Sequence, residues 1–338
     1  MNKVRIGING FGRIGKMFFR LLAHHPEIEL VGINDLMDDE MLLYLLKYDT
    51  VHGKFTKEVR VADNKLHING LQVHIGHYEN PSQIPWKEWD VDIVVESSGH
   101  FTTRESLQQH IDAGAKRVIL SSPTSDALDF TVVIGVNEDK LLPKHKIISN
   151  ASCTANCVAP VLNLLNKEIG IESAFLNTVH PYTNNQRIID SPHHDFRRSR
   201  ASANNIIPTS TSAIGAIHTI IPELKNKFNG ISTRVPIVCG ALSELVITFP
   251  EKVTEESINS LLMKYAQGSM SNILKYATDP IVSSDVIGSE YSCIFDSLAT
   301  KVVSNNTAQL ILWYDNEIGY SNRLVDLVLI MANQMGLA

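Results

Sequence analysis

The sequence predicts two domains, a doubly wound α/β domain followed by an α+β domain with a mixed or antiparallel sheet. Its 338 residues exceed one ordinary core and suit two domains of middling size. Up to about residue 150, short β-branched runs alternate with helical runs, as in a parallel α/β sheet. Later strand-like runs suggest a mixed or antiparallel sheet. We expect domains at 1–151 and 152–318, with a C-terminal helix, 319–338, that packs back on the first domain.

The first domain is expected to alternate strands and helices around one insertion. The segment Lys57–His77 alternates like an antiparallel excursion from the α/β rhythm. The other expected strands are Val4–Asn9, Ile28–Asn34, Val91–Glu96, Arg117–Leu120, Thr131–Gly135 and Lys146–Ser149. The expected helices are Arg13–Ala23, Met41–Leu46 and Ser106–Ala113.

The second domain is expected to open with a helix from Cys153 to about Lys167. A long polar segment from Asn184 to Asn205 shows little periodicity, which is typical of a functional loop. The expected strands are Phe175–His180, Thr233–Val238, Leu242–Phe249, Cys293–Phe295 and Ala308–Tyr314. The expected helices are Glu255–Gln267 and the amphipathic Asn322–Met335.

Composition favours a small soluble substrate. The hydrophobic share of 44% lets each domain bury a normal core, and the net charge of −6 gives no basic field for nucleic acid or an anionic membrane. Glycines interrupt the N-terminal apolar run, and no stretch reaches the roughly 20 apolar residues that span a bilayer. We therefore expect a cytoplasmic protein without membrane or nucleic-acid partners.

Four scattered cysteines are too few for a disulfide framework. Cys153 and Cys157 lie close in sequence, but no histidine or further cysteine nearby completes a zinc site. No metal site is expected.

Residues Gly10, Phe11, Gly12, Arg13, Ile14 and Gly15 form a G-x-G-x-x-G motif between a predicted strand and a predicted helix. The glycines permit a tight turn, close approach of a pyrophosphate and helix–strand packing, and the helix N-terminus faces the anion. Asp35 closes the second strand, where its carboxylate can bind a ribose and would repel a 2′-phosphate. The motif predicts an NAD-binding (Rossmann) domain; the alternative is that the glycines serve only a turn.

Cys153 is the candidate nucleophile. It lies where the first domain ends and a helix begins, and a helix N-terminus stabilises a thiolate. From its position alone, a buried inert cysteine is an equal alternative. Cys157, one helical turn later, is assigned to packing, as are Cys239 and Cys293 in strand-like runs.

The chain resembles the phosphorylating glyceraldehyde-3-phosphate dehydrogenase family over essentially its whole length. The similar segments follow the family's order. They are Ile8–Gly15, Leu46–Gly53, Ser149–Cys157, His180–Thr183, Arg197–Arg200, Asn205–Thr211, Arg234–Pro236 and Trp313–Tyr320. The resemblance implies that Cys153 forms a thioester with an aldehyde substrate and that His180 assists as base, with NAD as hydride acceptor and phosphate as acyl acceptor.

The resemblance also implies sites for two phosphate groups and for the nicotinamide. Ser152, Thr154 and Thr211 would hold inorganic phosphate, with Ser212 beside them, while Thr183 and Arg234 would hold the phosphate of glyceraldehyde 3-phosphate, with Arg198 near both. Asn316 would orient the nicotinamide carboxamide and Tyr320 would pack beside the ring; Ser121 is also assigned to the cofactor site. The family further implies a homotetramer in which Asn184–Asn205 reaches a neighbour's cofactor site.

Five positions depart from the family pattern without removing a catalytic group. Ala155 replaces a threonine, Asn185 an aspartate, Ser212 a glycine, Ile318 a tryptophan and Pro181 a small residue. Ser212 could tighten or obstruct the phosphate site, because glycine there brings a backbone amide close to the anion.

Two alternatives remain open. One is an erythrose-4-phosphate dehydrogenase, which shares the cysteine, histidine and cofactor motifs but not the full phosphate-holding set. The other is an NAD-binding redox sensor that acts through Cys153 with little enzymatic activity.

Overall fold

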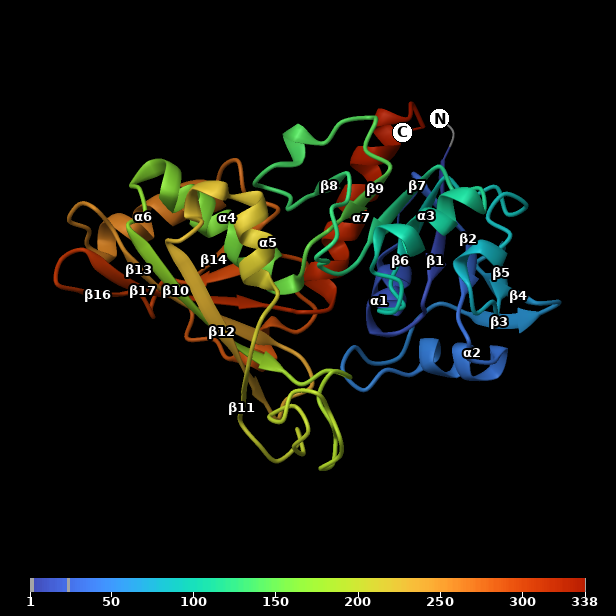
Figure 1. Cartoon of the computed structure of the whole chain (residues 1–338), viewed down its shortest axis with the longest axis horizontal. Helices are drawn as coiled ribbons and strands as arrows, with labels where there is room; N and C mark the ends of the chain where they lie inside the picture. The colour runs from blue at the N-terminus through green and yellow to red at the C-terminus, as the bar shows by residue number, and fades with distance from the viewer. Residues whose placement is uncertain (1–2, 23–24, 338) are drawn as a thin grey trace. The chain divides into compact units, whose positions relative to one another are not determined.

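The computed structural model describes residues 3–22 and 25–337, in two compact units (Figure 1). Unit 1 comprises the described residues of 1–132, 137–151 and 321–338. Unit 2 comprises residues 133–136 and 152–320. Within the described residues, no helix is both long and apolar enough to cross a membrane.

Unit 1 is built on a sheet of nine strands in the order β3-β4-β5-β2-β1-β6-β7-β9-β8. Every pair from β5 to β8 in this order is parallel, whereas β3, β4 and β5 pair antiparallel. The strands are β1 (Val4–Asn9), β2 (Ile28–Asn34), β3 (Val59–Ala62), β4 (Lys65–Ile68), β5 (Leu71–Gly76), β6 (Ile93–Glu96), β7 (Arg117–Leu120), β8 (Phe130–Thr131) and β9 (Ile147–Ser149).

The sheet of unit 1 extends from β1 through β2 on one side and through β6 on the other, which makes the carboxyl ends of β1 and β6 a topological switch point. Its helices are α1 (Arg13–Leu22), α2 (Asp39–Lys47) and α3 (Arg104–Asp112). A side-chain hydrogen bond from the residue before it caps α2, and a capping box starts α3. The expected doubly wound fold is confirmed.

Unit 2 contains a sheet of eight strands in the order β11-β12-β10-β13-β17-β15-β14, with β16 paired to β17. Burial alternates along β13 and β17, as in an antiparallel sheet with one open face. The strands are β10 (Ser173–Pro181), β11 (Ile207–Thr209), β12 (Phe228–Val235), β13 (Ala241–Thr248), β14 (Leu274–Ala277), β15 (Cys293–Asp296), β16 (Lys301–Val303) and β17 (Thr307–Tyr314). Two of its strand pairs are parallel, so the expected mixed sheet is confirmed.

The helices of unit 2 are α4 (Cys153–Glu168), α5 (Ala213–Ile220) and α6 (Glu255–Ala266). Helices α4 and α5 lie side by side (Figure 1). Helix α7 (Ile318–Gln334) starts in unit 2 and ends in unit 1, where Gln334 bonds to Arg117 and to the carbonyl of Leu141. Four short 3₁₀ turns are η1 (Pro81–Gln83), η2 (Glu138–Lys140), η3 (Pro222–Leu224) and η4 (Ser283–Val286).

Some expected elements were wrong in position. The strand expected at Thr131–Gly135 ends at Thr131, because residues 133–136 form a turn in which Gly135 has a φ of 87°. The strand expected to reach Val238 ends before Pro236, which has no backbone N–H to donate. Cys239 therefore lies in a turn rather than in a strand. Ala23, expected in the first helix, lies outside the described residues.

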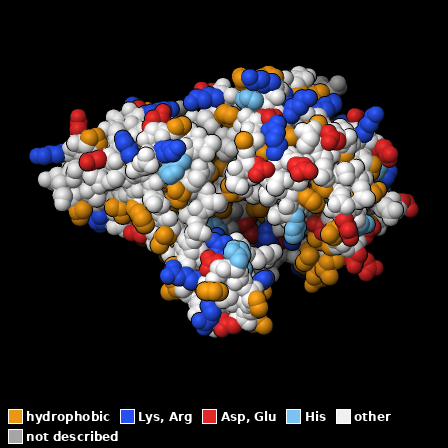
Figure 2. Space-filling view, viewed as in Figure 1, with side chains coloured by type: hydrophobic (Ala, Val, Ile, Leu, Met, Phe, Trp, Pro, Cys, Tyr) orange, Lys and Arg blue, Asp and Glu red, His pale blue; other side chains and the backbone are white. Residues whose placement is uncertain are grey.

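Residues 182–206, all described, contain no helix or strand. The segment folds back on itself, since the amides of Arg187 and Ser191 donate to the carbonyls of Arg198 and Ser199. Figure 2 shows charged, histidine and hydrophobic side chains intermixed on the molecular surface. The most exposed large apolar side chain of residues 182–206 is Phe196, which is 87% exposed.

Candidate active site

The structure brings Cys153 and His180 together in unit 2. Cys153 is the first residue of α4, which Ser152 caps by accepting a hydrogen bond from the amide of Ala155. His180 lies near the end of β10 and is 4% exposed. Its Nε2 is 3.4 Å from the Cys153 sulfur. A half-buried thiol therefore meets a buried imidazole at a helix N-terminus.

Arg234 and the carbonyl of Pro181 both contact Nδ1 of His180. Nη1 of Arg234 lies 2.6 Å from His180 Nδ1 and 2.9 Å from the carbonyl oxygen of Pro181. Nδ1 also lies 2.8 Å from the carbonyl oxygen of Pro181, so it accepts from Arg234 in one tautomer of the ring and donates to that carbonyl in the other. In the first tautomer Nε2 donates toward the Cys153 sulfur and favours a thiolate; in the second Nε2 accepts the thiol proton.

Burial and the neighbouring charge have opposite effects on the pKa of the Cys153 thiol. Burial raises the pKa of the Cys153 thiol, while the charge of Arg234 and the amide and hydroxyl of Thr154 lower it. Burial and Arg234 lower the pKa of His180 to about 3, so the imidazole is neutral at physiological pH. Burial also lowers the pKa of Arg234. Arg234 is therefore the cation that offsets the cost of a thiolate.

Tyr314 joins the hydroxyl groups behind the thiol. Its phenol oxygen lies 2.9 Å from Thr154 Oγ1 and 2.9 Å from Thr178 Oγ1, and its ring meets the edge of His180 at 6.1 Å. Burial raises the pKa of Tyr314, so the phenol stays protonated. The sequence placed Thr154 in a phosphate site, but its buried hydroxyl is engaged here. The sequence predicted a strand that ends at Tyr314 but did not single out this residue for the site.

The residues assigned to phosphate binding belong to unit 2. Arg198 donates to the carbonyl and hydroxyl of Ser210, and its charge further lowers the pKa of Arg234. Two guanidinium groups in mutual repulsion favour an anion between them. Thr183 bonds to Gln186, a buried residue that the sequence did not single out.

The other two phosphate candidates lie at the start of α5. The Thr211 hydroxyl accepts a weak hydrogen bond from the amide of Ala213. Ser212 occupies the cap position, is exposed, and makes no capping bond with its side chain. Its hydroxyl is thus not used to hold the helix.

The G-x-G-x-x-G segment of unit 1 leaves space for a ligand at its second glycine. Gly10 has a φ of 90°, and a Cβ there would lie 2.3 Å from the amide nitrogen of Ser98. A Cβ on Gly15 would lie 2.2 Å from the carbonyl oxygen of Gly10. A Cβ on Gly12 would meet nothing within 4 Å. The first and third glycines are thus required by packing, and the second faces open space, as a dinucleotide requires.

Other residues of this loop are held by carboxylates. The amide of Phe11 donates to Asp35 at 2.6 Å, and Arg13 pairs with Asp49. Ile14 is half-buried in the first turn of α1. Ser121 follows β7, and its amide donates to the carbonyl of Glu96. These contacts hold the loop in place, and the cofactor-binding role of its residues stays a prediction.

Asn316 and Tyr320, the nicotinamide candidates, belong to unit 2. Asn316 accepts a hydrogen bond from the amide of Gly240 through its side-chain oxygen, which leaves the amide nitrogen to face a ligand or another acceptor. Asp315 precedes it and accepts from the amides of Glu317 and Ile318, so it starts α7.

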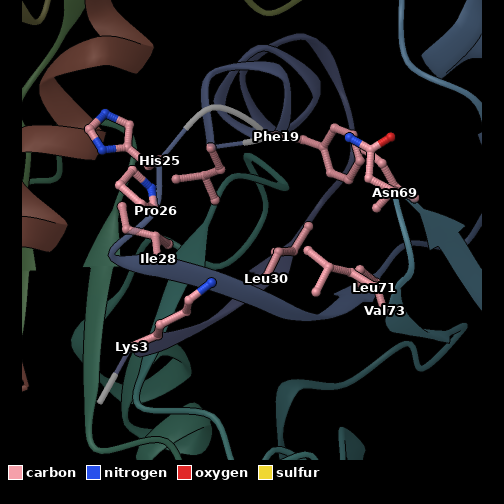
Figure 3. A pocket seen from close by; sticks show the side chains of 11 residues that line it. Lys3, Phe19, His25, Pro26, Ile28, Leu30, Asn69, Leu71 and Val73 are labelled. Carbon is pink, nitrogen blue, oxygen red and sulfur yellow. The ribbon is translucent and has the colours of Figure 1, made fainter. Parts of the chain in front are cut away.

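An apolar cavity of about 260 Å³ lies elsewhere in unit 1 (Figure 3). Its walls come from α1, β2 and the β4–β5 turn, and include Phe19, Leu30 and Val73. None of the residues selected from the sequence lines it. It lacks the converging polar groups of a catalytic site.

Comparison with known proteins agrees with this geometry. The model of the glyceraldehyde 3-phosphate dehydrogenase NAD binding domain matches residues 4–104, and that of the C-terminal domain matches residues 152–316. Glyceraldehyde-3-phosphate dehydrogenase 2 of Streptomyces avermitilis is 48% identical over 98% of this chain and 99% of its own. Glyceraldehyde-3-phosphate dehydrogenase 1 of Bacillus subtilis and the enzyme of Geobacillus stearothermophilus are each 47% identical over the same shares. The chain therefore belongs to the glyceraldehyde-3-phosphate dehydrogenase family and is an NAD-dependent oxidoreductase.

Proposed function

We propose that this enzyme oxidises D-glyceraldehyde 3-phosphate with NAD and inorganic phosphate to 1,3-bisphosphoglycerate, in glycolysis or gluconeogenesis. The observation that carries the proposal is the cluster of Cys153, His180 and Arg234 at the start of α4. It combines a nucleophile, a neutral imidazole and a cation that can hold a phosphate. Residues 1–151 with the C-terminal helix would form the NAD-binding domain, and 152–318 the catalytic domain.

Cys153 begins the reaction by adding its thiolate to the aldehyde carbon. In the tautomer whose Nδ1 donates to the Pro181 carbonyl, Nε2 of His180 takes the thiol proton and passes it to the carbonyl oxygen, which becomes the hemithioacetal hydroxyl. Nε2 is then free to act as the base for the hemithioacetal hydroxyl.

NAD, when bound, accepts the hydride that leaves the substrate carbon. The chain's own part is to hold the cofactor, through Gly10–Gly15 and Asp35, with Ser121, Asn316 and Tyr320 completing the set. After oxidation Cys153 carries a thioester, whose carbonyl phosphate attacks, and the thiolate leaves.

Two anion-binding groups would choose phosphate over water as the acyl acceptor. Thr183, Arg198 and Arg234 would hold the substrate phosphate. Ser152, Thr211 and Ser212 would hold inorganic phosphate at helix N-termini, with Thr154 contributing beside Cys153. The exposed Ser212 hydroxyl supports this role, because no capping bond occupies it.

Product analysis tests the proposal. Glyceraldehyde 3-phosphate and erythrose 4-phosphate are each incubated with NAD, with and without inorganic phosphate, and acyl phosphate and NADH are measured. Phosphate-dependent acyl phosphate from the triose is the expected result. Free acid as the product under all conditions would overturn it, and a preference for erythrose 4-phosphate would assign the rival substrate. Absence of NADH production would favour the alternative that the protein is an NAD-binding redox sensor.

We further propose a homotetramer in the cytoplasm. The open face of the unit 2 sheet exposes Phe175 and Val246, which are direct partners across β10 and β13. Neighbouring apolar side chains on an exposed sheet favour burial against another subunit. Sedimentation of the purified protein tests this, and a monomer at micromolar concentration would contradict it.

A further inference from the structure

A buried carboxylate lies at the switch point of unit 1. Glu96, the last residue of β6, is 1% exposed. Its Oε2 accepts from Asn9 Nδ2 at 2.5 Å and from His110 Nε2 at 3.0 Å. Its Oε1 accepts from the amide and the hydroxyl of Ser98, at 2.8 and 2.5 Å. A shell of four donors matches a side chain with two acceptor oxygens, as a carboxylate has.

The tautomer of His110 is fixed by Trp86. Trp86 Nε1 lies 2.9 Å from His110 Nδ1, and an indole N–H can only donate. Nδ1 therefore accepts, and the ring proton lies on Nε2, where it is donated to Glu96. Both side chains are fully buried. Helix α3, which carries His110, is thereby tied to the end of β6.

Glu96 joins the two loops that follow β1 and β6. Asn9 ends β1 directly before Gly10, and its Oδ1 accepts from Asn34 at the end of β2. Ser98 supports the backbone of Gly10 so closely that a Cβ on that glycine would collide with it. The Glu96 carboxylate thus sets the distance between the loop that follows β1 and the loop that follows β6.

We propose that Glu96, oriented by His110, is a positioning residue for NAD: it holds the loop at 97–99 against Gly10 in the arrangement that the dinucleotide requires. The inference rests on the NAD dependence of the proposed function and not on its thioester chemistry. Glu96 acts through Asn9 and Ser98 and is not itself a cofactor ligand.

Glu96→Gln is the direct test. An amide presents its NH₂ group to two donors whichever way it is turned, so one pair of donors loses its acceptor. We expect the Kd of NAD, measured by titration calorimetry on the cofactor-free protein, to rise about tenfold or more. The alkylation rate of Cys153 without NAD should stay within about twofold, because the thiol belongs to unit 2.

His110 variants separate positioning from packing. Glutamine can accept from Trp86 and donate to Glu96, so His110→Gln should retain most of the NAD affinity. His110→Met fills similar space without a donor and should weaken NAD binding about tenfold. Gln108→Met, on the exposed side of the same helix, is the matched control.

The outcomes are distinguishable even if Glu96→Gln fails to fold. Equal NAD affinity in His110→Gln and His110→Met would overturn the inference, as would a lowered Tm with an unchanged Kd. A raised Kd in Glu96→Gln and His110→Met alone, with normal Cys153 alkylation, would support it. Loss of phosphate-dependent acyl transfer at normal NAD affinity would instead count against the proposed function.

Discussion

The glycine loop of unit 1 and the thiol site of unit 2 are built on different physical terms. At the loop, backbone shape is decisive: Gly10 and Gly15 are required by packing, and every donor around Glu96 has its acceptor. At the thiol site, burial disfavours the charged forms of Cys153, His180 and Arg234. Cofactor binding at the loop depends mainly on the shape of the backbone. Chemistry at the thiol site depends on particular side chains. Substitutions in the two regions should therefore have separable effects.

Cys153→Ser should break the chemistry and leave cofactor binding intact. A hydroxyl is a far weaker nucleophile at neutral pH than a thiolate, so NADH formation should fall by about 10³-fold or more. The Kd of NAD should change little. Cys157→Ala is the matched control, because this buried thiol lies outside the proposed chemistry. Comparable NADH formation by Cys153→Ser and the parent enzyme would exclude the thioester.

Arg234→Gln should show how much catalysis and thiol ionisation depend on the charge of Arg234. It removes a phosphate ligand, the donor to His180 Nδ1 and the charge that lowers the pKa of Cys153. We expect kcat/KM to fall about 10²-fold or more. The midpoint of the pH profile for Cys153 alkylation should move upward. Arg197→Gln, an exposed neighbour of Arg198, serves as control; a midpoint that stays in place would mean that Arg234 only binds substrate.

His180→Asn should reveal the stability cost of a buried imidazole. Since the pKa of His180 is about 3 in the fold and ordinary when unfolded, the unfolded state binds the proton first as pH falls. The parent protein should lose about 2 kcal/mol between pH 7.5 and pH 5 from this group, with the loss beginning below about pH 6.5. Urea unfolding of both proteins measures it. Parallel pH profiles for the two would contradict the buried neutral state.

Asp35→Ser should alter cofactor choice without touching the thiol. The Asp35 carboxylate accepts from the amides of Phe11 and Met37, and its charge would repel a 2′-phosphate. Its removal should reduce the preference for NAD over NADP about tenfold, as measured by kcat/KM with each. Glu40→Gln, an exposed acid on α2, controls for net charge. An unchanged preference would exclude Asp35 as the discriminating group.

The sequence predicted an element most accurately where the residue pattern within it and the residues at its ends indicate the same bounds. Strands Val4–Asn9 and Ile28–Asn34 matched at both ends, since each largely apolar run, with one charged residue at its second position, is bounded by polar residues. Thr131–Gly135 was wrong because its β-branched composition predicts a strand, whereas Gly135 at a φ of 87° allows the turn that replaces it. The strands β11 and β14 are too short to show a period, and neither they nor α5 were expected.

The candidate site was predictable only in part. The G-x-G-x-x-G spacing encodes its own geometry, whereas nothing near Cys153 in sequence indicates that His180 and Arg234 meet it. Adjacent strands β10 and β12 bring those two residues into register, a relation that a linear pattern does not contain. Family resemblance supplied them, but neither resemblance nor pattern indicated the Glu96 shell.

The path of the chain through unit 1 has a consequence for biosynthesis. A ribosome releases Gly10 early, yet the core of that unit is incomplete until Leu324, Val328 and Met331 of α7 emerge more than three hundred residues later. Nascent chains usually gain structure from the amino end. In this protein, residues 152–320 can fold before the segment that precedes them. A chain terminated at residue 320 should therefore lose its affinity for NAD and keep the reactivity of the Cys153 thiol.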